Sequence, residues 1–118
     1  MTRRICVTGA NGLAGRAVVR ELREHGYDVA ATDIVTTFGE DDVLRADLTD
    51  YGQAAEALSG ASAVVHLANI PAPGLTTPAV TFNANMTMNF NVFQAAPAGC
   101  SATSRATPGA TTCPPRRR

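Results

Sequence analysis

Apolar residues along positions 1–96 alternate between short continuous runs and runs with helical spacing. The continuous runs predict buried strands, and the runs with a period of about 3.6 residues predict amphipathic helices. Because strands alternate with helices, we expect parallel pairing with right-handed crossovers, and hence an α/β fold with a doubly wound parallel sheet. The pattern places strands at 4–9, 27–33, 42–47 and 63–67, and helices at 13–24, 51–58 and 78–96.

Two of the predicted helices carry further local signals. Asp50, with Gln53 three residues later, is typical of a helix N-cap. The last helix has an apolar stripe at helical spacing, which we expect to be a core face rather than a cofactor-binding surface. The stripe consists of Phe82, Met86, Phe90 and Phe93.

The composition changes abruptly after Ala96. Residues 97–118 contain four Ala, four Thr, four Pro and four Arg, but no Val, Ile, Leu, Phe, Tyr or Met. So few buriable side chains cannot offset the entropy of ordering, which predicts a disordered tail. The sheet would then be truncated after the fourth strand and its following helix, leaving strand 63–67 with a bare edge open to self-association. A frameshifted or truncated gene product and a natural disordered tail both fit this composition.

Bulk composition narrows the class of protein. The chain has 118 residues, no formal net charge, and ten basic residues that are all arginine. No apolar run approaches the roughly 18 residues of a membrane span, so we predict a cytoplasmic protein without a membrane partner. Cys6, Cys100 and Cys113 lack the spacing of zinc ligands, and His25 and His66 are isolated from them, so no metal site is predicted. The terminal PPRRR is too weak a basic patch to predict a nucleic-acid partner.

Three glycines follow the first predicted strand in the stretch VTGANGLAG, and a predicted helix begins within it. Gly9 permits a sharp exit from the strand, Gly12 permits close approach of a pyrophosphate, and Gly15 lets the helix lie close to the strand. The helix N-terminus would then present unpaired N–H groups to the phosphates. The glycines alone leave a plain strand-to-helix turn as the alternative.

Asp33 supports the phosphate-binding interpretation. It ends the second predicted strand, where a carboxylate can accept hydrogen bonds from both hydroxyls of an adenosine ribose. No Lys or Arg occurs between Arg23 and Arg45 to receive a 2′-phosphate. The sequence therefore favours NAD over NADP as the cofactor, because a 2′-phosphate would meet Asp33 as a like charge.

Five motifs in order resemble the extended short-chain dehydrogenase/reductases, the NAD-dependent epimerase/dehydratase family. They are residues 7–15, Asp33, ADLTD at 46–50, VVHLAN at 64–69 and NMTMNFNVFQAA at 85–96. The resemblance covers roughly residues 3–96, which in that family is the N-terminal portion. It implies a partial NAD(P)-binding Rossmann domain at 1–96, with a nucleotide sugar or another small molecule as the substrate of a full-length member.

The resemblance also assigns roles to matching positions. Asp47 resembles the residue that hydrogen-bonds the adenine amino group, with Leu48 beside the ring; an aspartate that serves only the helix approach is the alternative. Leu67 and Ala68 resemble the strand end that passes the nicotinamide-side ribose. Asn85 resembles a helix asparagine that supports the active site, although an internal polar residue would look the same. The candidate cofactor-binding residues are thus Gly9, Asn11, Gly12, Leu13, Gly15, Asp33, Asp47, Leu48, Leu67, Ala68 and Asn85.

Catalytic residues of the family have no counterpart in this sequence. Family catalysis uses a tyrosine whose pKa is lowered by a lysine four residues later. Here Tyr27 and Tyr51 are the only tyrosines, and there is no lysine. We expect His66 to be a strand residue with a satisfied hydrogen bond rather than a general base. The chain is therefore predicted to be the NAD-binding portion of an oxidoreductase or epimerase, inactive by itself, with a noncatalytic binding module or a nonfunctional fragment as alternatives.

Overall fold

The computed structural model describes residues 3–36, 42–97, 101–104 and 111–112. Strands and helices alternate along the chain, as the hydrophobic pattern predicts. The elements are β1 (Arg4–Thr8), α1 (Leu13–Glu24), β2 (Asp28–Asp33), β3 (Val43–Arg45), α2 (Tyr51–Leu58), β4 (Ala63–His66), α3 (Pro78–Ala95), β5 (Ser101–Ser104) and β6 (Thr111–Thr112). No helix among these ranges is both long enough and apolar enough to cross a membrane.

The strands form one sheet in the order β3-β2-β1-β4-β5-β6. Strands β1 to β4 pair in parallel, with Thr8 of β1 opposite both Thr32 of β2 and His66 of β4. The chain thus starts in the middle of the sheet, runs to one edge through β2 and β3, and returns to the other side through β4. This topology confirms the predicted Rossmann-like α/β class, and it creates a switch point between β1 and β4 where ligands of such sheets bind.

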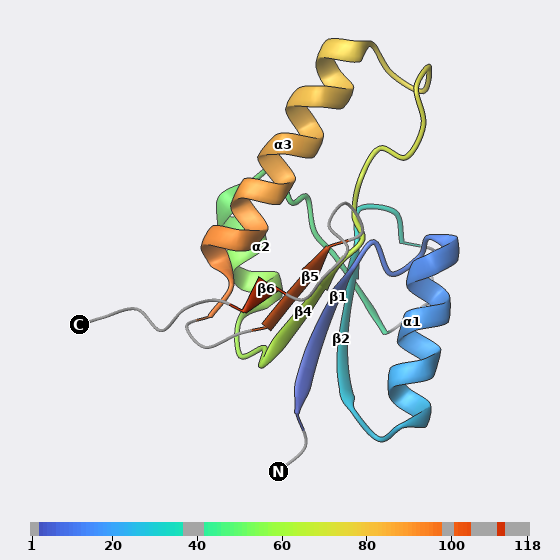
Figure 1. Cartoon of the computed structure of the whole chain (residues 1–118), viewed down its shortest axis with the longest axis vertical. Helices are drawn as coiled ribbons and strands as arrows, with labels where there is room; N and C mark the ends of the chain where they lie inside the picture. The colour runs from blue at the N-terminus through green and yellow to red at the C-terminus, as the bar shows by residue number, and fades with distance from the viewer. Residues whose placement is uncertain (1–2, 37–41, 98–100, 105–110, 113–118) are drawn as a thin grey trace, which may run out of the picture.

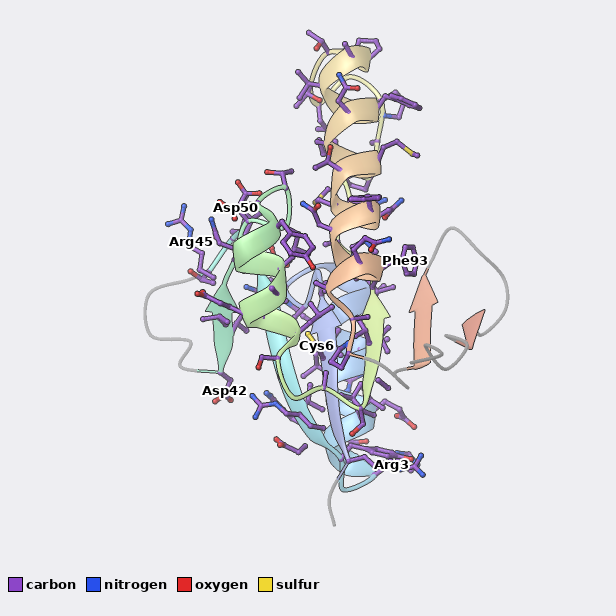
Figure 2. The ribbon with its side chains drawn as sticks, turned by 90° about the vertical axis from the view of Figure 1, so that its left-hand side faces the viewer. Arg3, Cys6, Asp42, Arg45, Asp50 and Phe93 are labelled. Carbon is purple, nitrogen blue, oxygen red and sulfur yellow. The ribbon has the colours of Figure 1, made fainter. Side chains whose placement is uncertain are left out.

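Helices cover both faces of the sheet (Figure 1): α1 lies on one face, and α2 and α3 lie on the other. The side chains of β1 alternate between two buried clusters accordingly. Val7 packs with Val19 of α1, whereas Cys6 packs with Leu58 of α2 and Val92 of α3. Figure 2 shows Cys6 between the sheet and α2. The parallel sheet is therefore buried on both faces, and its strand ends are held in fixed positions.

A fifth strand corrects the prediction for the tail. Strand β5 pairs in parallel with β4, so that Ser104 lies opposite His66, and β6 pairs antiparallel with β5. Strand β4 therefore has no bare edge, and the expected self-association through that edge loses its basis. Disorder was predicted for all of residues 97–118, and this is wrong for the two segments that form β5 and β6. The remainder of that prediction, from residue 98 on, lies outside the described residues. Backbone N–H and C=O groups suffice to pair an edge strand, so small side chains do not prevent it.

Helix α3 corrects the prediction for the Phe and Met stripe. The side chains expected in the core are instead exposed, at 66% for Phe82, 53% for Met86, 63% for Phe90 and 39% for Phe93. The buried side of α3 carries Val92, which is fully buried, and Asn91, which is 6% exposed. The N-terminal half of α3 extends past the sheet (Figure 1), and Phe93 projects on the side away from α2 (Figure 2). Three asparagines of this helix, rather than its phenylalanines, bond to the body of the protein: Asn85, Asn89 and Asn91.

Candidate functional site

A cleft of about 960 Å³ opens at the carboxyl ends of β1, β2 and β4. Its lining comes from the glycine turn, the ends of β2 and β4, the segment after β3, and one side of α3. Every candidate binding residue except Asn85 lines this cleft: Gly9, Asn11, Gly12, Leu13, Gly15, Asp33, Asp47, Leu48, Leu67 and Ala68. Residues predicted from separate motifs thus meet in one cavity.

The glycine turn is too tight for side chains at two of its three positions. Gly9 has φ +67°, and a Cβ atom there would lie 2.7 Å from the backbone nitrogen of Ala68. A Cβ atom on Gly15 would lie 2.0 Å from the carbonyl oxygen of Gly9. Gly12 differs, because it is exposed and a Cβ atom would meet only the Gly9 carbonyl oxygen, at 3.3 Å. Gly9 and Gly15 are therefore required by the turn itself, whereas Gly12 leaves open space in the cleft.

The first turn of α1 faces this open space. Gly12 is the N-cap residue, so no side chain caps the helix, and the first turn contains no acidic residue. The first N–H groups of an α-helix lack acceptors within the helix, and the helix dipole adds partial positive charge there. Leu13 is 95% exposed, so the entrance of the cleft is not blocked by packing. A turn of this kind can bind a phosphate group through backbone N–H donors alone.

Asp33 is fixed beside the glycine turn by two backbone groups. Its Oδ2 accepts a hydrogen bond from the Asn11 N–H at 2.9 Å, and its Oδ1 accepts one from the Val35 N–H at 3.0 Å. The Asn11 side chain donates in turn to the Val35 carbonyl oxygen. Each carboxylate oxygen can accept more than one hydrogen bond. The half-buried carboxylate is thus held in one orientation and keeps acceptor capacity for a ligand.

The segment after β3 is organised by Asp47. Its Oδ1 accepts hydrogen bonds from the Thr49 N–H and hydroxyl, at 3.0 and 2.6 Å, and its N–H donates to the Gln53 side chain at 2.8 Å. Asp50 caps α2 by accepting from the Gln53 N–H at 3.2 Å, as predicted. Leu48 is 4% exposed and belongs to the core, while it also borders the cleft. Among the described residues, hydrogen bonds to the Asp47 carboxylate reach only its Oδ1 atom, so Oδ2 can accept one from a ligand.

At the end of β4 the chain is held by a hydroxyl that the sequence prediction missed. The N–H groups of Leu67 and Ala68 both donate to Thr8 Oγ1, at 3.0 and 3.2 Å. Thr8 is fully buried at the end of β1, directly before the glycine turn. A threonine between a strand and a glycine has no local pattern that distinguishes this role, so only the pairing of β1 with β4 could reveal it.

His66 extends the same network toward α3. Its Nδ1 lies 2.6 Å from Thr8 Oγ1, and its Nε2 lies 2.8 Å from Asn89 Oδ1. The imidazole is 2% exposed, and its ring meets the edge of Phe93 with ring centroids 6.4 Å apart. Burial lowers the pKa of His66 from its ordinary value, and the hydrogen bond to Asn89 opposes this shift. The prediction of a strand histidine with satisfied hydrogen bonds is confirmed.

Asn85 lies outside the cleft lining and braces the loop that follows β4. Its Oδ1 accepts from the Ile70 N–H at 2.7 Å, and its Nδ2 donates to the Ile70 carbonyl oxygen at 3.2 Å. Asn91 forms a similar brace to the Leu48 carbonyl oxygen at 2.9 Å. Asparagines of α3 thus hold both the β4 side and the β3 side of the cleft.

A glycine turn after β1, an acid at the end of β2 and a switch-point cleft together define the dinucleotide-binding type of α/β protein. The sequence matches the model of the NAD dependent epimerase/dehydratase family over residues 5–111. The chain belongs to this family. The match continues past residue 96, where the sequence resemblance was expected to end.

Solved structures and a curated protein show the same likeness. A short-chain dehydrogenase/reductase superfamily protein from Agrobacterium tumefaciens, solved with bound NAD, is 31% identical with a TM-score of 0.69, covering 80% of this chain and 29% of that one. UDP-glucose 4-epimerase from Thermus thermophilus, solved in complex with NAD, is 25% identical with a TM-score of 0.68, covering 78% of this chain and 33% of that one. The bifunctional dihydroflavonol 4-reductase/flavanone 4-reductase of Pyrus communis is 37% identical over 54% of this chain and 22% of its own length. The chain therefore spans about a fifth to a third of these proteins.

Proposed function

We propose that this chain is the NAD-binding portion of an oxidoreductase or epimerase of the NAD-dependent epimerase/dehydratase type. The observation that carries the proposal is the joint position of the uncapped α1 N-terminus and the Asp33 carboxylate on one cleft. The helix N-terminus suits a pyrophosphate, and the carboxylate suits the two hydroxyls of a ribose. A dinucleotide contains both of these groups in one molecule. Family membership and the NAD bound to related structures support the same cofactor.

In this proposal each group of candidate residues contacts a different part of the cofactor. The α1 N-terminus, beside Gly12, takes the pyrophosphate, and Asp33 takes the adenosine ribose. The Oδ2 atom of Asp47 is available to the adenine amino group, and the backbone of Leu67 and Ala68 borders the nicotinamide-side ribose. NAD supplies hydride transfer when it is bound. Asn85 acts at one remove, because it does not line the cleft itself but holds the backbone of Ile70, which does.

We further propose that NAD is preferred over NADP. The Asp33 carboxylate would repel a 2′-phosphate, and it has already been fixed in place by the Asn11 and Val35 N–H groups. Arg16 on α1 directly follows the phosphate turn in the sequence. Its side chain lines the cleft and is exposed. An exposed arginine is screened by solvent, and we expect the fixed carboxylate to decide the preference.

The chain by itself is proposed to lack catalysis, with residues 1–96 as a partial NAD(P)-binding domain. Tyr27 and Tyr51 are 41% and 51% exposed, and neither borders the cleft. Without a positioned acid/base, proton transfer loses a factor of roughly a hundred to ten thousand. The substrate of a full-length member, whether a nucleotide sugar or another small molecule, would be bound mainly by parts that this chain does not span. A noncatalytic binding module is the alternative, and a cytoplasmic location is proposed for either on composition alone.

Calorimetric titration of the chain with NAD tests this function, using Gly12→Val as the diagnostic variant. A valine at Gly12 would fill the proposed pyrophosphate position, while its extended backbone, with φ −70° and ψ 168°, accepts a side chain. We expect binding to the wild type and at least a tenfold loss for Gly12→Val. Gly52→Ala, in α2 and away from the cleft lining, serves as the matched control and should bind normally. Unchanged affinity in Gly12→Val would reject the phosphate assignment.

A further inference from the structure

Two buried side chains and a half-buried one, from separate elements, form a hydrogen-bonded chain behind the cleft. They are Thr8 of β1, His66 of β4 and Asn89 of α3. Thr8 and His66 are nearly inaccessible to solvent, at 0% and 2% exposed. Thr8 Oγ1 is also the shared acceptor of the Leu67 and Ala68 N–H groups, whose segment borders the cleft. The hydroxyl therefore has three partners, and their donor and acceptor roles are linked.

Only one tautomer of His66 satisfies all of these groups. Asn89 Oδ1 is an acceptor, so Nε2 of His66 carries a proton and donates it. In the neutral ring Nδ1 is then an acceptor, and the Thr8 hydroxyl donates its single proton to Nδ1. The two lone pairs of Thr8 Oγ1 remain for the Leu67 and Ala68 N–H groups. With the opposite tautomer, three donors would compete for two lone pairs and the Thr8 proton would lose its acceptor.

Protonation of His66 would have the same effect as the wrong tautomer. A proton taken up from solvent at Nδ1 would turn that nitrogen into a donor toward Thr8 Oγ1. The Thr8 hydroxyl would have to rotate away, and one of the two backbone N–H groups would lose this acceptor. The Leu67 N–H also donates to the Thr8 carbonyl oxygen at 3.2 Å, so the loss falls on the Ala68 N–H. A buried N–H without an acceptor costs about 1–3 kcal/mol. The Ala68 N–H therefore keeps its acceptor only while His66 is neutral.

This backbone segment in turn contacts the phosphate turn. A Cβ atom on Gly9 would lie 2.7 Å from the Ala68 nitrogen and 2.8 Å from the Leu67 carbonyl carbon, so the two segments are in van der Waals contact already. A displacement of Leu67 and Ala68 cannot be absorbed by free space at this point. Such a displacement would move Gly9, and with it the glycine turn that precedes α1.

No neighbouring charge opposes this coupling in the described part of the chain. Among the elements against the ring, β1 carries Arg4 and Cys6 as its other ionisable residues, and α3 carries no ionisable residue. Arg4 is exposed at the far end of β1, and the Cys6 thiol donates to the Ala57 carbonyl oxygen at 3.5 Å. Strand β5, paired with β4, contains only Ser, Ala and Thr. No carboxylate on these elements would stabilise an imidazolium.

We propose that His66 is a positioning residue of the dinucleotide site, which acts through Thr8 to hold the Leu67–Ala68 backbone and loosens it at Ala68 when protonated. The effect on NAD affinity rests on the proposed NAD-binding function. The tautomer of His66 and its effect on the backbone do not. It predicts that dinucleotide affinity decreases as the pH falls below neutrality. In the pH range where His66 is largely protonated, the binding-competent fraction changes by up to tenfold per pH unit.

Nitrogen NMR of the full chain, uniformly labelled with nitrogen-15, tests the structural part without any ligand. Above pH 7 we expect His66 to carry its proton on Nε2 and to leave Nδ1 unprotonated. On acidification, the Leu67 and Ala68 amide signals should shift with the same midpoint as the His66 ring, below the ordinary histidine pKa of about 6.5. A proton on Nδ1 at neutral pH, or amide signals that do not follow the ring, would overturn the inference.

NAD titrations between pH 5 and pH 8 test the functional part. His66→Gln should flatten the pH dependence, and Asn89→Asp should move its midpoint upward, because a carboxylate at that position favours the imidazolium. Thr8→Val should weaken binding at every pH, whereas Thr8→Ser should restore it. His25→Gln, which changes the only other histidine, should retain the wild-type profile. The same profile in wild type, His66→Gln and Asn89→Asp would refute the inference. Absence of NAD binding at any pH would instead reject the proposed function, and the ligand-free NMR titration would still decide the role of His66.

Discussion

Gly15→Ala is predicted to destabilise the fold, because it adds a side chain where the backbone leaves no room. The added methyl carbon would lie 2.0 Å from the Gly9 carbonyl oxygen and 2.8 Å from both the Gly9 carbonyl carbon and the Ala10 Cα. All three atoms are backbone atoms, so no side chain can rotate to make room. A normal carbon-to-oxygen contact requires that α1 and the glycine turn separate by about 1 Å, which close-packed interiors resist.

Two opposing terms set the size of the effect. Alanine is favoured over glycine inside a helix by roughly 1 kcal/mol. Overpacking in a well-packed region costs about 1–3 kcal/mol and more where only backbone can move. We expect a net destabilisation of about 1–2 kcal/mol, which is the upper part of the overpacking cost less the gain in helix propensity. With a urea slope of about 1–3 kcal/mol per molar, the midpoint of unfolding should decrease by roughly 1 M.

Urea unfolding of the wild type, Gly15→Ala and Gly52→Ala provides the test. Gly52 is also a helical glycine, but it is exposed, and its Cβ atom would meet only the Asp50 Oδ1, at 3.3 Å. Gly52→Ala should therefore unfold within about 1 kcal/mol of the wild type. Equal stability of Gly15→Ala and Gly52→Ala would show that α1 does not lie as close to the glycine turn as described.

Three further predictions concern α3, its loop contacts and the buried histidine. Val92→Ala should lower the free energy of unfolding by about 1–3 kcal/mol because Val92 is fully buried, whereas Phe82→Ser should change it by less than about 0.5 kcal/mol, as measured by urea unfolding. Asn85→Ala should speed hydrogen exchange of the Ile70 amide, since it removes the acceptor at 2.7 Å; exchange unchanged from the wild type would contradict that brace. Stability should decrease as the pH falls below about 6.5, because the lowered pKa of His66 means that the unfolded chain binds more protons there; the urea midpoint of His66→Gln should depend less on pH.

The features that the sequence predicted well are local or strictly periodic. The glycine turn and Asp33 could be placed because each belongs to a strand end that the hydrophobic pattern fixes, and parallel strands bring their carboxyl ends to one edge. Asp47 and Leu48 line the same cleft because they follow the carboxyl end of another parallel strand. The additional bonds of Asp33 to the Asn11 and Val35 N–H groups could not be predicted, since they depend on how two loops meet.

The errors arose where tertiary contacts override the pattern. The stripe of Phe82, Met86 and Phe90 was predicted to be buried because apolar side chains usually are. In α3, amide groups occupy that place, and Asn91 donates to the Leu48 carbonyl oxygen from a site only 6% exposed. Loops present unpaired backbone groups, which a buried asparagine can satisfy and a phenylalanine cannot. Strand β5 was missed because its pairing with β4 depends on backbone groups, which composition does not report.

The most direct test of the central claim is a pair of calorimetric titrations, with NAD and with NADP, on the wild type and Asp33→Ala. We expect the wild type to bind NAD more tightly than NADP. In Asp33→Ala, NAD affinity should fall at least tenfold, since about 1.5–3 kcal/mol is typical of hydrogen bonds to a charged group, and the preference for NAD should shrink. Equal affinity of the wild type for the two dinucleotides, or full NAD affinity in Asp33→Ala, would contradict the assignment of this cleft.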